Sequence, residues 1–572
     1  MMDVQGLSGA EAFLRLLGKI GVEYIFASPG SEWAPVWEYL AKPYSPDDDI
    51  PQYLSARHEE IAVGMASGYA KATGKLPAVM IHTTVGTLHA AMALRAAVHE
   101  QIPIAVFTGE SIGFGAGKGP DPGQQWLRRL ADVGGPVRLV EPCVKWSFGV
   151  NTPTVLPATI PRACQLAMSA PRGPVLVSLP MEYLFETMTT NAPASLSLPR
   201  RATADPDGIE ELAHMLAEAK NPIIIAEEFG RSVGAVERLV ELAELLGAPV
   251  VETKDPGYVN FPRKHRLHGG NEPSAYLKDA DLVVLLEAVA PWHPPGAGPA
   301  AGAKIVALGE SPLLPELPFW GLSLDLCLAG EMESSVTQLI EQLKKRIVPG
   351  DSTRAKRAAE WERRHRERKQ AWKEAALALK SRKPIDTAWV VHELNEILPA
   401  DAIVVDETIT HRTHITSELD RLGPGSFFSG FCGGLGTGLG SALGVKVACP
   451  NRPVITLVGD GAFSYNPAFA ALGFAQEYGM PILIVIFNNH GYLSQKSGIP
   501  KYYPEGWAVQ SKTFVGTSIT PSPDYAAIAR AFDGYGEKVE EPGEVRLALE
   551  RGLKAVASGQ LALIDVWLEP VN

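Results

Sequence analysis

The residues best suited to hold a phosphate group follow the short apolar segment 454–458. This segment, Val-Ile-Thr-Leu-Val, runs directly into Gly459-Asp460-Gly461, and a helical pattern covers 467–478. Glycines let a backbone approach a diphosphate closely, and the N–H groups at the start of a helix donate hydrogen bonds to anions. The order of strand, glycine turn and helix therefore predicts a phosphate-binding element.

Oxygen ligands for a divalent cation follow the next predicted strand. The apolar run 482–487 leads into 488–492, Asn-Asn-His-Gly-Tyr, and parallel strands deliver their carboxyl ends to one edge of a sheet. Asp460 offers a carboxylate oxygen, Asn489 an amide oxygen and Gly491 a backbone carbonyl. With diphosphate oxygens and water, these complete the octahedral oxygen shell that Mg²⁺ prefers. A lone Gly-Asp-Gly is usually only a turn, but Asn-Asn beginning 27 residues after its last glycine favours a metal site.

A candidate acid for catalysis precedes a helix in the first part of the chain. Arg57-His58-Glu59-Glu60 stands at a predicted strand-to-helix junction and is followed by the small-residue stretch 61–70. Taken alone, Glu59 is typical of an acid stabilised by the positive end of a helix. By itself this glutamate indicates no particular reaction.

Alternating apolar runs and helical patterns position these residues. The runs are bounded by Gly or Pro, which is typical of parallel sheets wrapped by helices. The predicted strands are 23–27, 78–82, 104–108 and 175–179, then 222–226, 249–252, 281–286 and 304–307, then 402–405, 454–458, 482–487 and 561–566. They indicate an α/β protein with three doubly wound parallel-sheet domains.

Composition suggests where these domains begin and end. The stretch 191–207 is rich in Ala, Pro, Ser and Thr, and 344–384 is strongly charged, with 354–382 typical of one solvated helix. We expect an N-terminal domain at 1–190, a central domain at 205–345, a charged helical linker at 346–384 and a C-terminal domain at 385–572.

A weak internal similarity links the two outer domains. The segment 60–75 leads into strand 78–82, and 436–449 leads into strand 454–458 in the same manner. The outer domains are either copies of one another or simply two folds of one class.

The overall composition excludes several classes of protein. The chain has 572 residues, of which 46% are hydrophobic and 20% charged, typical of a folded protein of several domains. A net charge of -12 argues against a nucleic-acid partner or an anionic membrane surface. The five cysteines form no C-x-x-C pair, which predicts a reducing, cytoplasmic location. The amphipathic run 10–20 resembles neither an export signal nor a membrane span.

These motifs together resemble those of the thiamin-diphosphate-dependent enzymes. In that family the matching Asp460 and Asn489 bind Mg²⁺, Gly491 adds its carbonyl, and the backbones of Gly461 and Ala462 contact the diphosphate. The spacer is long for the family, so Asn488 is the alternative ligand if the register slips by one residue.

The same resemblance assigns Glu59, rather than Glu60, to the acid that activates the cofactor through its aminopyrimidine ring. The family places this acid against cofactor held by a neighbouring subunit, which implies a homodimer or homotetramer. Cys432-Gly-Gly-Leu-Gly resembles the segment under the pyrimidine, where Gly433 accepts a hydrogen bond and Leu435 bends the cofactor. Further cofactor contacts are expected at Thr408, Thr410, Gly459 and Tyr492. The three domains would then be pyrimidine-binding, central and diphosphate-binding.

Within the family, the chain resembles benzoylformate decarboxylases and, next to them, acetolactate-synthase-like proteins. Ser28-Pro-Gly-Ser-Glu resembles a turn whose serine, here Ser31, meets the substrate carboxylate. His82 matches a catalytic histidine, and His293 lies where a second one is expected, although its loop is shorter and proline-rich. Cys143-Val-Lys-Trp-Ser resembles a strand of those enzymes. Considered alone, either histidine is more often a surface or core residue than a catalyst.

The resemblance implies a non-oxidative decarboxylase of a small 2-keto acid, one option being an aromatic acid such as benzoylformate, that acts through a C2 carbanion and an enamine. Ser31 would bind the carboxylate, and His82 or His293 would move protons. Two alternatives remain open: a carboligase of the acetolactate-synthase type, and a cofactor-binding scaffold without catalysis. No flavin motif is present in the central domain.

Overall fold

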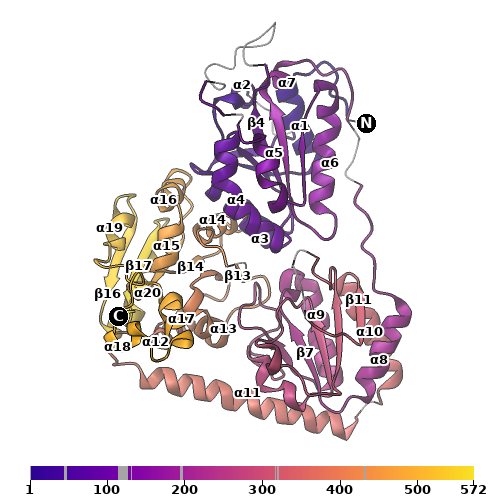
Figure 1. Cartoon of the computed structure of the whole chain (residues 1–572), viewed down its shortest axis with the longest axis vertical. Helices are drawn as coiled ribbons and strands as arrows, with labels where there is room; N and C mark the ends of the chain where they lie inside the picture. The colour runs from indigo at the N-terminus through magenta and orange to yellow at the C-terminus, as the bar shows by residue number, and fades with distance from the viewer. Residues whose placement is uncertain are drawn as a thin grey trace. The chain divides into compact units, whose positions relative to one another are not determined.

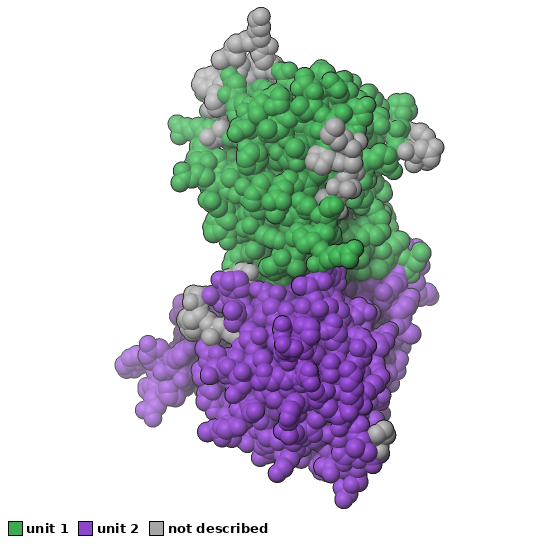
Figure 2. All heavy atoms as spheres, turned by 90° about the vertical axis from the view of Figure 1, so that its right-hand side faces the viewer, with its two compact units in different colours: residues 1–200, 432–451, 464–481 green, residues 201–431, 452–463, 482–572 purple. Residues whose placement is uncertain are grey.

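The computed structural model contains three parallel β-sheets, each within an α/β domain (Figure 1). Contacts along the chain define two compact units (Figure 2). Unit 1 comprises Met1–Arg200, Cys432–Asn451 and Ser464–Pro481, and unit 2 comprises Arg201–Phe431, Arg452–Phe463 and Ile482–Asn572. The structure describes residues 2–43, 48–113, 127–130, 132–192, 197–315, 317, 321–348, 350–430 and 433–571. Cys432 of the glycine-rich segment lies outside these residues.

Unit 1 is built on one six-stranded sheet in the order β2-β1-β3-β4-β6-β5. Its strands are β1 Tyr24–Ser28, β2 Gln52–Ser55, β3 Ala78–Ile81, β4 Ile104–Glu110, β5 Trp146–Gly149 and β6 Pro174–Pro180. Its helices are α1 Gly9–Ile20, α2 Ala34–Leu40, α3 Glu59–Thr73, α4 Thr84–His99, α5 Gly135–Val140, α6 Leu156–Met168, α7 Met181–Phe185, α14 Gly438–Ala448 and α16 Ala468–Glu477. The four strands predicted from their apolar runs are confirmed, and β5 overlaps the segment identified by resemblance.

Unit 2 contains the other two sheets, in the orders β11-β10-β9-β7-β8 and β13-β12-β14-β15-β17-β16. Their strands are β7 Pro222–Ala226, β8 Val250–Glu252, β9 Leu282–Leu286, β10 Lys304–Gly309, β11 Leu326–Ala329, β12 Ile403–Glu407, β13 Phe427–Ser429, β14 Val454–Gly459, β15 Leu483–Asn488, β16 Tyr535–Val539 and β17 Ala562–Trp567. The helices are α8 Pro206–Glu218, α9 Val233–Leu246, α10 Met332–Arg346, α11 Ser352–Ala378, α12 Thr387–Ile397, α13 Arg412–Glu418, α17 Leu493–Tyr502, α18 Trp507–Ser511, α19 Tyr525–Arg530 and α20 Val545–Ala557. All strand pairs in both sheets are parallel.

The similarity between the outer sheets extends to their topology. Counted along the chain, the first and third sheets both run second, first, third, fourth, sixth, fifth strand. Helix α3 follows β2 in one sheet, and α14 follows β13 in the other. These two helices are therefore topological equivalents.

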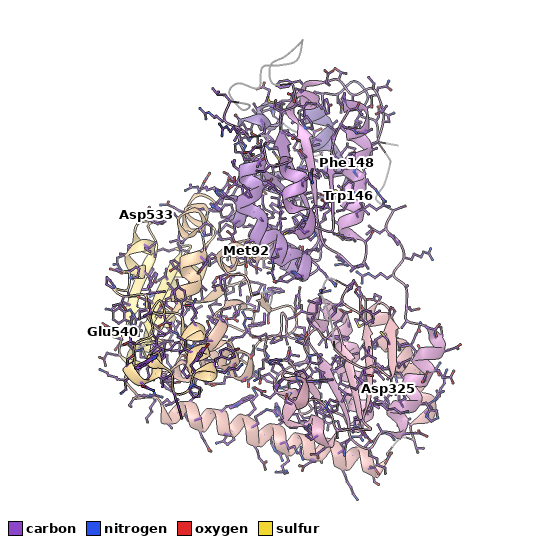
Figure 3. The ribbon with its side chains drawn as sticks, in the orientation of Figure 1. Met92, Trp146, Phe148, Asp325, Asp533 and Glu540 are labelled. Atoms are coloured by element: carbon purple, nitrogen blue, oxygen red, sulfur yellow. The ribbon has the colours of Figure 1, made fainter. Side chains whose placement is uncertain are left out.

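The strands that the apolar runs did not predict lie at sheet edges. β2, β11, β13 and β16 are each the last strand of their sheet. These strands are short, with three to five residues, and β2, β11 and β16 are only partly buried, so they lack the long apolar run of a strand covered on both faces. On β5, another edge strand, Trp146 and Phe148 stack with ring centroids 5.7 Å apart (Figure 3).

Most of the charged segment 346–384 forms one long helix, α11, and one face of this helix is buried. α11 buries Ala358, Trp361, His365 and Ala376. The Arg357 guanidinium donates to the carbonyls of Lys220 and Gly247, at 2.7 and 3.2 Å. The helix is therefore packed within unit 2 and is not solvated on all sides. Within the described part of the chain, no helix combines the length and the apolar character that crossing a bilayer requires.

Helices α3 and α14 cross within unit 1 at a contact that only glycine allows. A Cβ atom added to Gly68 would lie 2.0 Å from the carbonyl oxygen of Ser441, and one added to Gly444 would lie 1.9 Å from that of Met65. Gly64 and Gly440 face each other at the same crossing. Because real Cβ atoms never approach a carbonyl so closely, the backbones of the two helices touch directly.

We expect Gly68→Ala to lower the free energy of unfolding of unit 1 by about 1–3 kcal/mol, because the added methyl group forces α3 and α14 apart. Chemical denaturation would measure the loss. The control is Gly498→Ala in α17, where no atom lies within 4 Å of the new Cβ and the change should be neutral or slightly stabilising. Equal effects of the two changes would contradict a tight crossing.

Candidate active site

Glu59 is the first residue of α3 in unit 1. The side chain of His58 caps this helix, since its Nδ1 accepts a hydrogen bond from the N–H of Glu60 at 3.1 Å. Arg57, in the left-handed region with φ 62°, pairs with Glu477 at 2.8 Å and fixes the chain before the helix. Burial lowers the pKa of His58, which keeps its Nδ1 free to accept. The start of α3 is thus held rigidly where Glu59 emerges.

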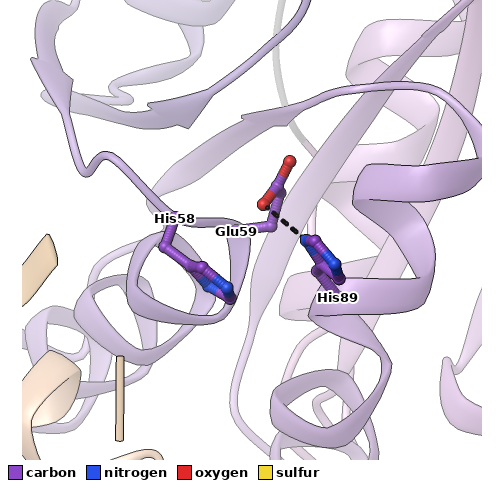
Figure 4. Close-up of side chains that lie close together, drawn as sticks. All are labelled: His58, Glu59 and His89. Atoms are coloured by element: carbon purple, nitrogen blue, oxygen red, sulfur yellow. Dashed lines mark hydrogen bonds and ion pairs between the residues drawn. The ribbon is translucent and has the colours of Figure 1, made fainter. Parts of the chain in front are cut away.

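The carboxylate of Glu59 is largely buried and faces α4. Its side chain is 13% exposed, and its Oε2 lies 3.3 Å from Nδ1 of His89 (Figure 4). A Cβ added to Gly86 would lie 2.9 Å from Oε1 of Glu59 and 2.8 Å from Cβ of His82. The absence of a side chain at residue 86 therefore leaves room between the acid and the histidine.

His82, at the end of β3, forms a pair with Glu32. Its Nδ1 lies 2.8 Å from Oε1 of Glu32, whose side chain is fully buried. Burial alone lowers the pKa of His82, but the hydrogen bond and the negative charge of Glu32 outweigh it, so the pKa is raised. Because the carboxylate accepts from Nδ1, Nε2 of His82 is left for a reacting group. Ser31 is exposed beside this pair and opens the turn Ser31–Trp33.

Glu32 was not among the residues predicted from the sequence. Its signal was present, because it directly follows Ser31 in the turn that suggested a substrate contact. The sequence does not reveal that the fold brings Glu32 and His82, which are 50 residues apart, into contact.

We expect Glu32→Gln to lower the pKa of His82, because the neutral amide removes the charge that stabilises the imidazolium. Since the raised pKa keeps His82 protonated to higher pH, its proton would be lost at lower pH in the variant. NMR titration of the histidine ring nitrogens would measure this shift. Glu38→Gln, on the exposed surface of α2, is the matched control and should leave the titration unchanged.

The glycine-rich segment before α14 also belongs to unit 1. Gly433 and Gly436 adopt φ values of 69° and 108°, and Leu435 is half-buried. A Cβ added to Gly434 would meet the methyl group of Met92, a residue of α4 (Figure 3). A Cβ at Gly436 would lie 3.0 Å from Oε1 of Glu60. Unit 1 thus brings this segment beside α4 and the start of α3.

In unit 2, the predicted phosphate and metal residues meet at the carboxyl ends of β14 and β15. The N–H of Gly491 donates to Oδ2 of Asp460 at 2.9 Å, and the ring of Tyr492 lies over Gly461, 2.8 Å from the position of a Cβ. A short helix, α15 Asp460–Tyr465, begins directly after Gly459. The helix predicted at 467–478 is therefore the second helix after the turn, and the turn itself enters α15.

Asn489 is oriented by a neutral histidine. Burial lowers the pKa of His411 to about 4. Its Nδ1 lies 2.8 Å from Oγ1 of Thr387 and its Nε2 lies 3.2 Å from Nδ2 of Asn489, so the ring can donate to the hydroxyl and accept from the amide. The amide oxygen Oδ1 of Asn489 is then buried with no hydrogen-bond partner among the described residues.

These donors fit a divalent cation. Burial raises the pKa of Asp460 to about 6, so a bound cation would restore the charge that burial disfavours. The amide oxygen of Asn489, which has no hydrogen-bond partner among the described residues, could bind the same cation as a ligand. By contrast, the amide of Asn488 donates to Asp565 at 2.9 Å and accepts from the N–H of His490 at 3.1 Å. Asn489, rather than Asn488, is the amide available for a metal.

The remaining predicted residues have less specific surroundings. The hydroxyl and the backbone N–H of Thr408 both donate to Oδ1 of Asp406, at 2.7 and 3.2 Å, and Thr410 is half-buried. Ala462 is buried beside Gly461 in α15. His293 is exposed in unit 2, in the loop after β9, whereas His82 belongs to unit 1. The two predicted histidines therefore belong to different units.

Comparisons with known proteins identify the class to which this site belongs. The model for the thiamine pyrophosphate enzyme N-terminal TPP binding domain matches residues 7–120, that for the central domain matches 209–308, and that for the C-terminal TPP binding domain matches 411–566. Together these matches cover more than half of the chain. The chain therefore belongs to the thiamine pyrophosphate enzyme family.

Individual relatives include enzymes of two kinds. Benzoylformate decarboxylase of Pseudomonas aeruginosa is 27% identical over 98% of this chain and 99% of its own length. Acetolactate synthase of Mycobacterium bovis is also 27% identical, over 95% of this chain and 85% of its own. The crystal structure of benzoylformate decarboxylase from Polynucleobacter necessarius has the same fold, with a TM-score of 0.78 at 23% identity over 98% of both chains.

Proposed function

We propose that this protein is a Mg²⁺-requiring, non-oxidative decarboxylase of a 2-keto acid, with aromatic acids such as benzoylformate among its candidate substrates. When bound, thiamin diphosphate supplies a nucleophilic carbon and an electron sink for the bond next to the keto carbonyl. The observation that carries the proposal is that Gly86 adjoins both Glu59 and His82. One part of unit 1 thus offers a buried acid and an oriented histidine.

The side chains of unit 1 then have distinct tasks. Glu59 bonds the ring nitrogen of the cofactor's aminopyrimidine and so controls which tautomer acts as base. His82, with a hydrogen held at Nδ1 by Glu32, gives or takes a proton at Nε2. Ser31 binds the substrate carboxylate, and His293 is the proposed second histidine.

The residues proposed to hold the diphosphate and the metal belong to unit 2. Asp460, Asn489 and Gly491 would bind Mg²⁺ through a carboxylate, an amide oxygen and a carbonyl. The remaining proposed cofactor contacts are Gly433, Leu435, Thr408, Thr410, Gly459, Gly461, Ala462 and Tyr492. We also infer a homodimer or homotetramer, which sedimentation of the purified protein would test.

A carboligase of the acetolactate-synthase type is the second candidate. It is favoured by the relative from Mycobacterium bovis and by Arg57-His58-Glu59 at the start of α3. The Glu32–His82 pair favours the decarboxylase, because formation of an aldehyde requires a proton donor at the reacting carbon, whereas ligation to a second carbonyl compound does not.

The deciding experiment supplies thiamin diphosphate, Mg²⁺ and a panel of 2-keto acids from pyruvate to benzoylformate to the purified chain. Carbon dioxide with an equal amount of free aldehyde supports the decarboxylase and ranks its substrates. Formation of an acyloin or an acetohydroxy acid from pyruvate would contradict the decarboxylase and support the carboligase. Binding of cofactor without turnover of any member would contradict both and favour a non-catalytic scaffold.

A further inference from the structure

Three side chains that commonly bind transition metals lie together at the start of α3 (Figure 4). His58 caps the helix, Glu59 is its first residue, and His89 comes from the neighbouring helix α4. One donor atom from each lies within 4.8 Å of the other two. The two imidazole rings stack, with centroids 5.1 Å apart and an angle of 11° between their planes.

Two imidazoles and one carboxylate are a ligand set that zinc uses, with a fourth position left to water. Ligand atoms of a tetrahedral zinc ion, with bonds of about 2.0–2.1 Å, lie roughly 3.3 Å apart. The distance between Glu59 Oε2 and His89 Nδ1 already has this value, at 3.3 Å. His89 is 62% exposed, so its ring is free to turn toward an entering ion.

We propose that His58, Glu59 and His89 bind one Zn²⁺ ion in the cofactor-free protein, and that this ion competes with thiamin diphosphate. The competition rests on the proposed function, in which Glu59 must bond the aminopyrimidine, whereas the metal site itself does not. A carboxylate that binds Zn²⁺ is not available to the ring nitrogen. The site is therefore an inhibitory one, separate from the Mg²⁺ ligands of unit 2.

The cap of α3 makes this binding reversible. A neutral imidazole carries one hydrogen, and Nδ1 of His58 now accepts from the N–H of Glu60. If Nε2 of His58 binds the metal, Nδ1 must carry the hydrogen and can no longer accept. If Nδ1 binds the metal instead, the lone pair of Nδ1 is occupied by the metal. Either way the helix loses this hydrogen bond, so we expect an exchangeable ion. Mg²⁺ should not replace it, because Mg²⁺ prefers oxygen ligands.

The metal site is tested by binding alone. Cofactor-free full-length protein is titrated with Zn²⁺ against a chromophoric chelator, and with Co²⁺ while its visible spectrum is recorded. We expect one ion per chain and a tetrahedral Co²⁺ spectrum. His89→Ala should weaken binding at least about tenfold, whereas His99→Ala, on the same helix but outside the cluster, should change it less than twofold. Equal binding by the two variants, or no saturable binding, overturns the site.

The competition is tested by cofactor binding, measured without turnover. In excess Mg²⁺, Zn²⁺ should raise the thiamin diphosphate concentration needed for half-saturation at least about tenfold in the wild type and not in His89→Ala. Stoichiometric Zn²⁺ binding without this increase overturns the competition. If Zn²⁺ binds and competes but no 2-keto acid is turned over, the inhibitory site stands and the proposed reaction fails. Thermal unfolding of each variant verifies its folding.

Discussion

Glu59→Gln should reduce turnover of the best 2-keto acid by about 10²- to 10⁴-fold while thiamin diphosphate still binds. The amide keeps the size of the side chain but cannot share a proton with the aminopyrimidine, so the cofactor's own base is not activated. Because the carboxylate is 13% exposed beside Gly86, water has little access to replace it. The rate of hydrogen exchange at C2 of the bound cofactor, measured by NMR, should fall with the turnover.

Glu60→Gln is the matched control, because it makes the same change one residue further along α3. The side chain of Glu60 faces Gly436 rather than Gly86, so we expect less than about a tenfold loss. A large loss with Glu60→Gln and a small one with Glu59→Gln would show that the acid had been assigned one residue out of register.

Asp460→Asn should weaken binding of thiamin diphosphate in the presence of Mg²⁺ by about 10²-fold. An uncharged amide retains the hydrogen bond from Gly491 only in part and loses the charge that holds a divalent ion, a loss of about 2–3 kcal/mol. Asn489→Ala should act in the same direction. Isothermal titration at several Mg²⁺ concentrations would measure both the affinity and the metal requirement.

Asn488→Ala distinguishes a metal ligand from a structural amide. Since Asn488 bonds Asp565 and His490, its loss should lower thermal stability without changing the concentration of Mg²⁺ required. The opposite pattern, with Asn488→Ala raising that concentration and Asn489→Ala leaving it unchanged, would reverse the assignment.

The pH dependence of Mg²⁺ binding tests whether the carboxylate of Asp460 is a metal ligand. Its pKa of about 6 in the free protein means that a proton must leave before Mg²⁺ binds. The affinity for Mg²⁺ should therefore rise about tenfold per pH unit below pH 6 and become constant above it. An affinity that does not change between pH 5 and pH 7 would contradict a role for this carboxylate.

The interior strands of each sheet could be predicted from the sequence, whereas of the edge strands only β8 was found from its apolar run. Strands such as β4, β7 and β15 are buried on both faces and read as continuous apolar runs. β16, with Gly536, Glu537 and Lys538 at its centre, has no such run. Asp460 and Asn489 were predictable because each follows an interior strand.

Residues whose roles depend on distant parts of the chain were harder to predict. The partnership of Glu32 with His82 and the choice between Asn488 and Asn489 both depend on hydrogen bonds between segments far apart in sequence. The assignment of α14 to unit 1 has the same origin, since its contact with α3 joins residues about 370 positions apart. No local pattern contains such information.

That contact also sets an order of events during protein synthesis. α3 leaves the ribosome long before α14 has been made, and at about 5–20 residues per second the interval is roughly 20–70 seconds. Throughout this time, the glycine-lined side of α3 lacks the helix that covers it in the native protein. The N-terminal sheet of the nascent chain must therefore persist with an incomplete surface, on which a chaperone could act until α14, which lies within the last third of the polypeptide, has been translated.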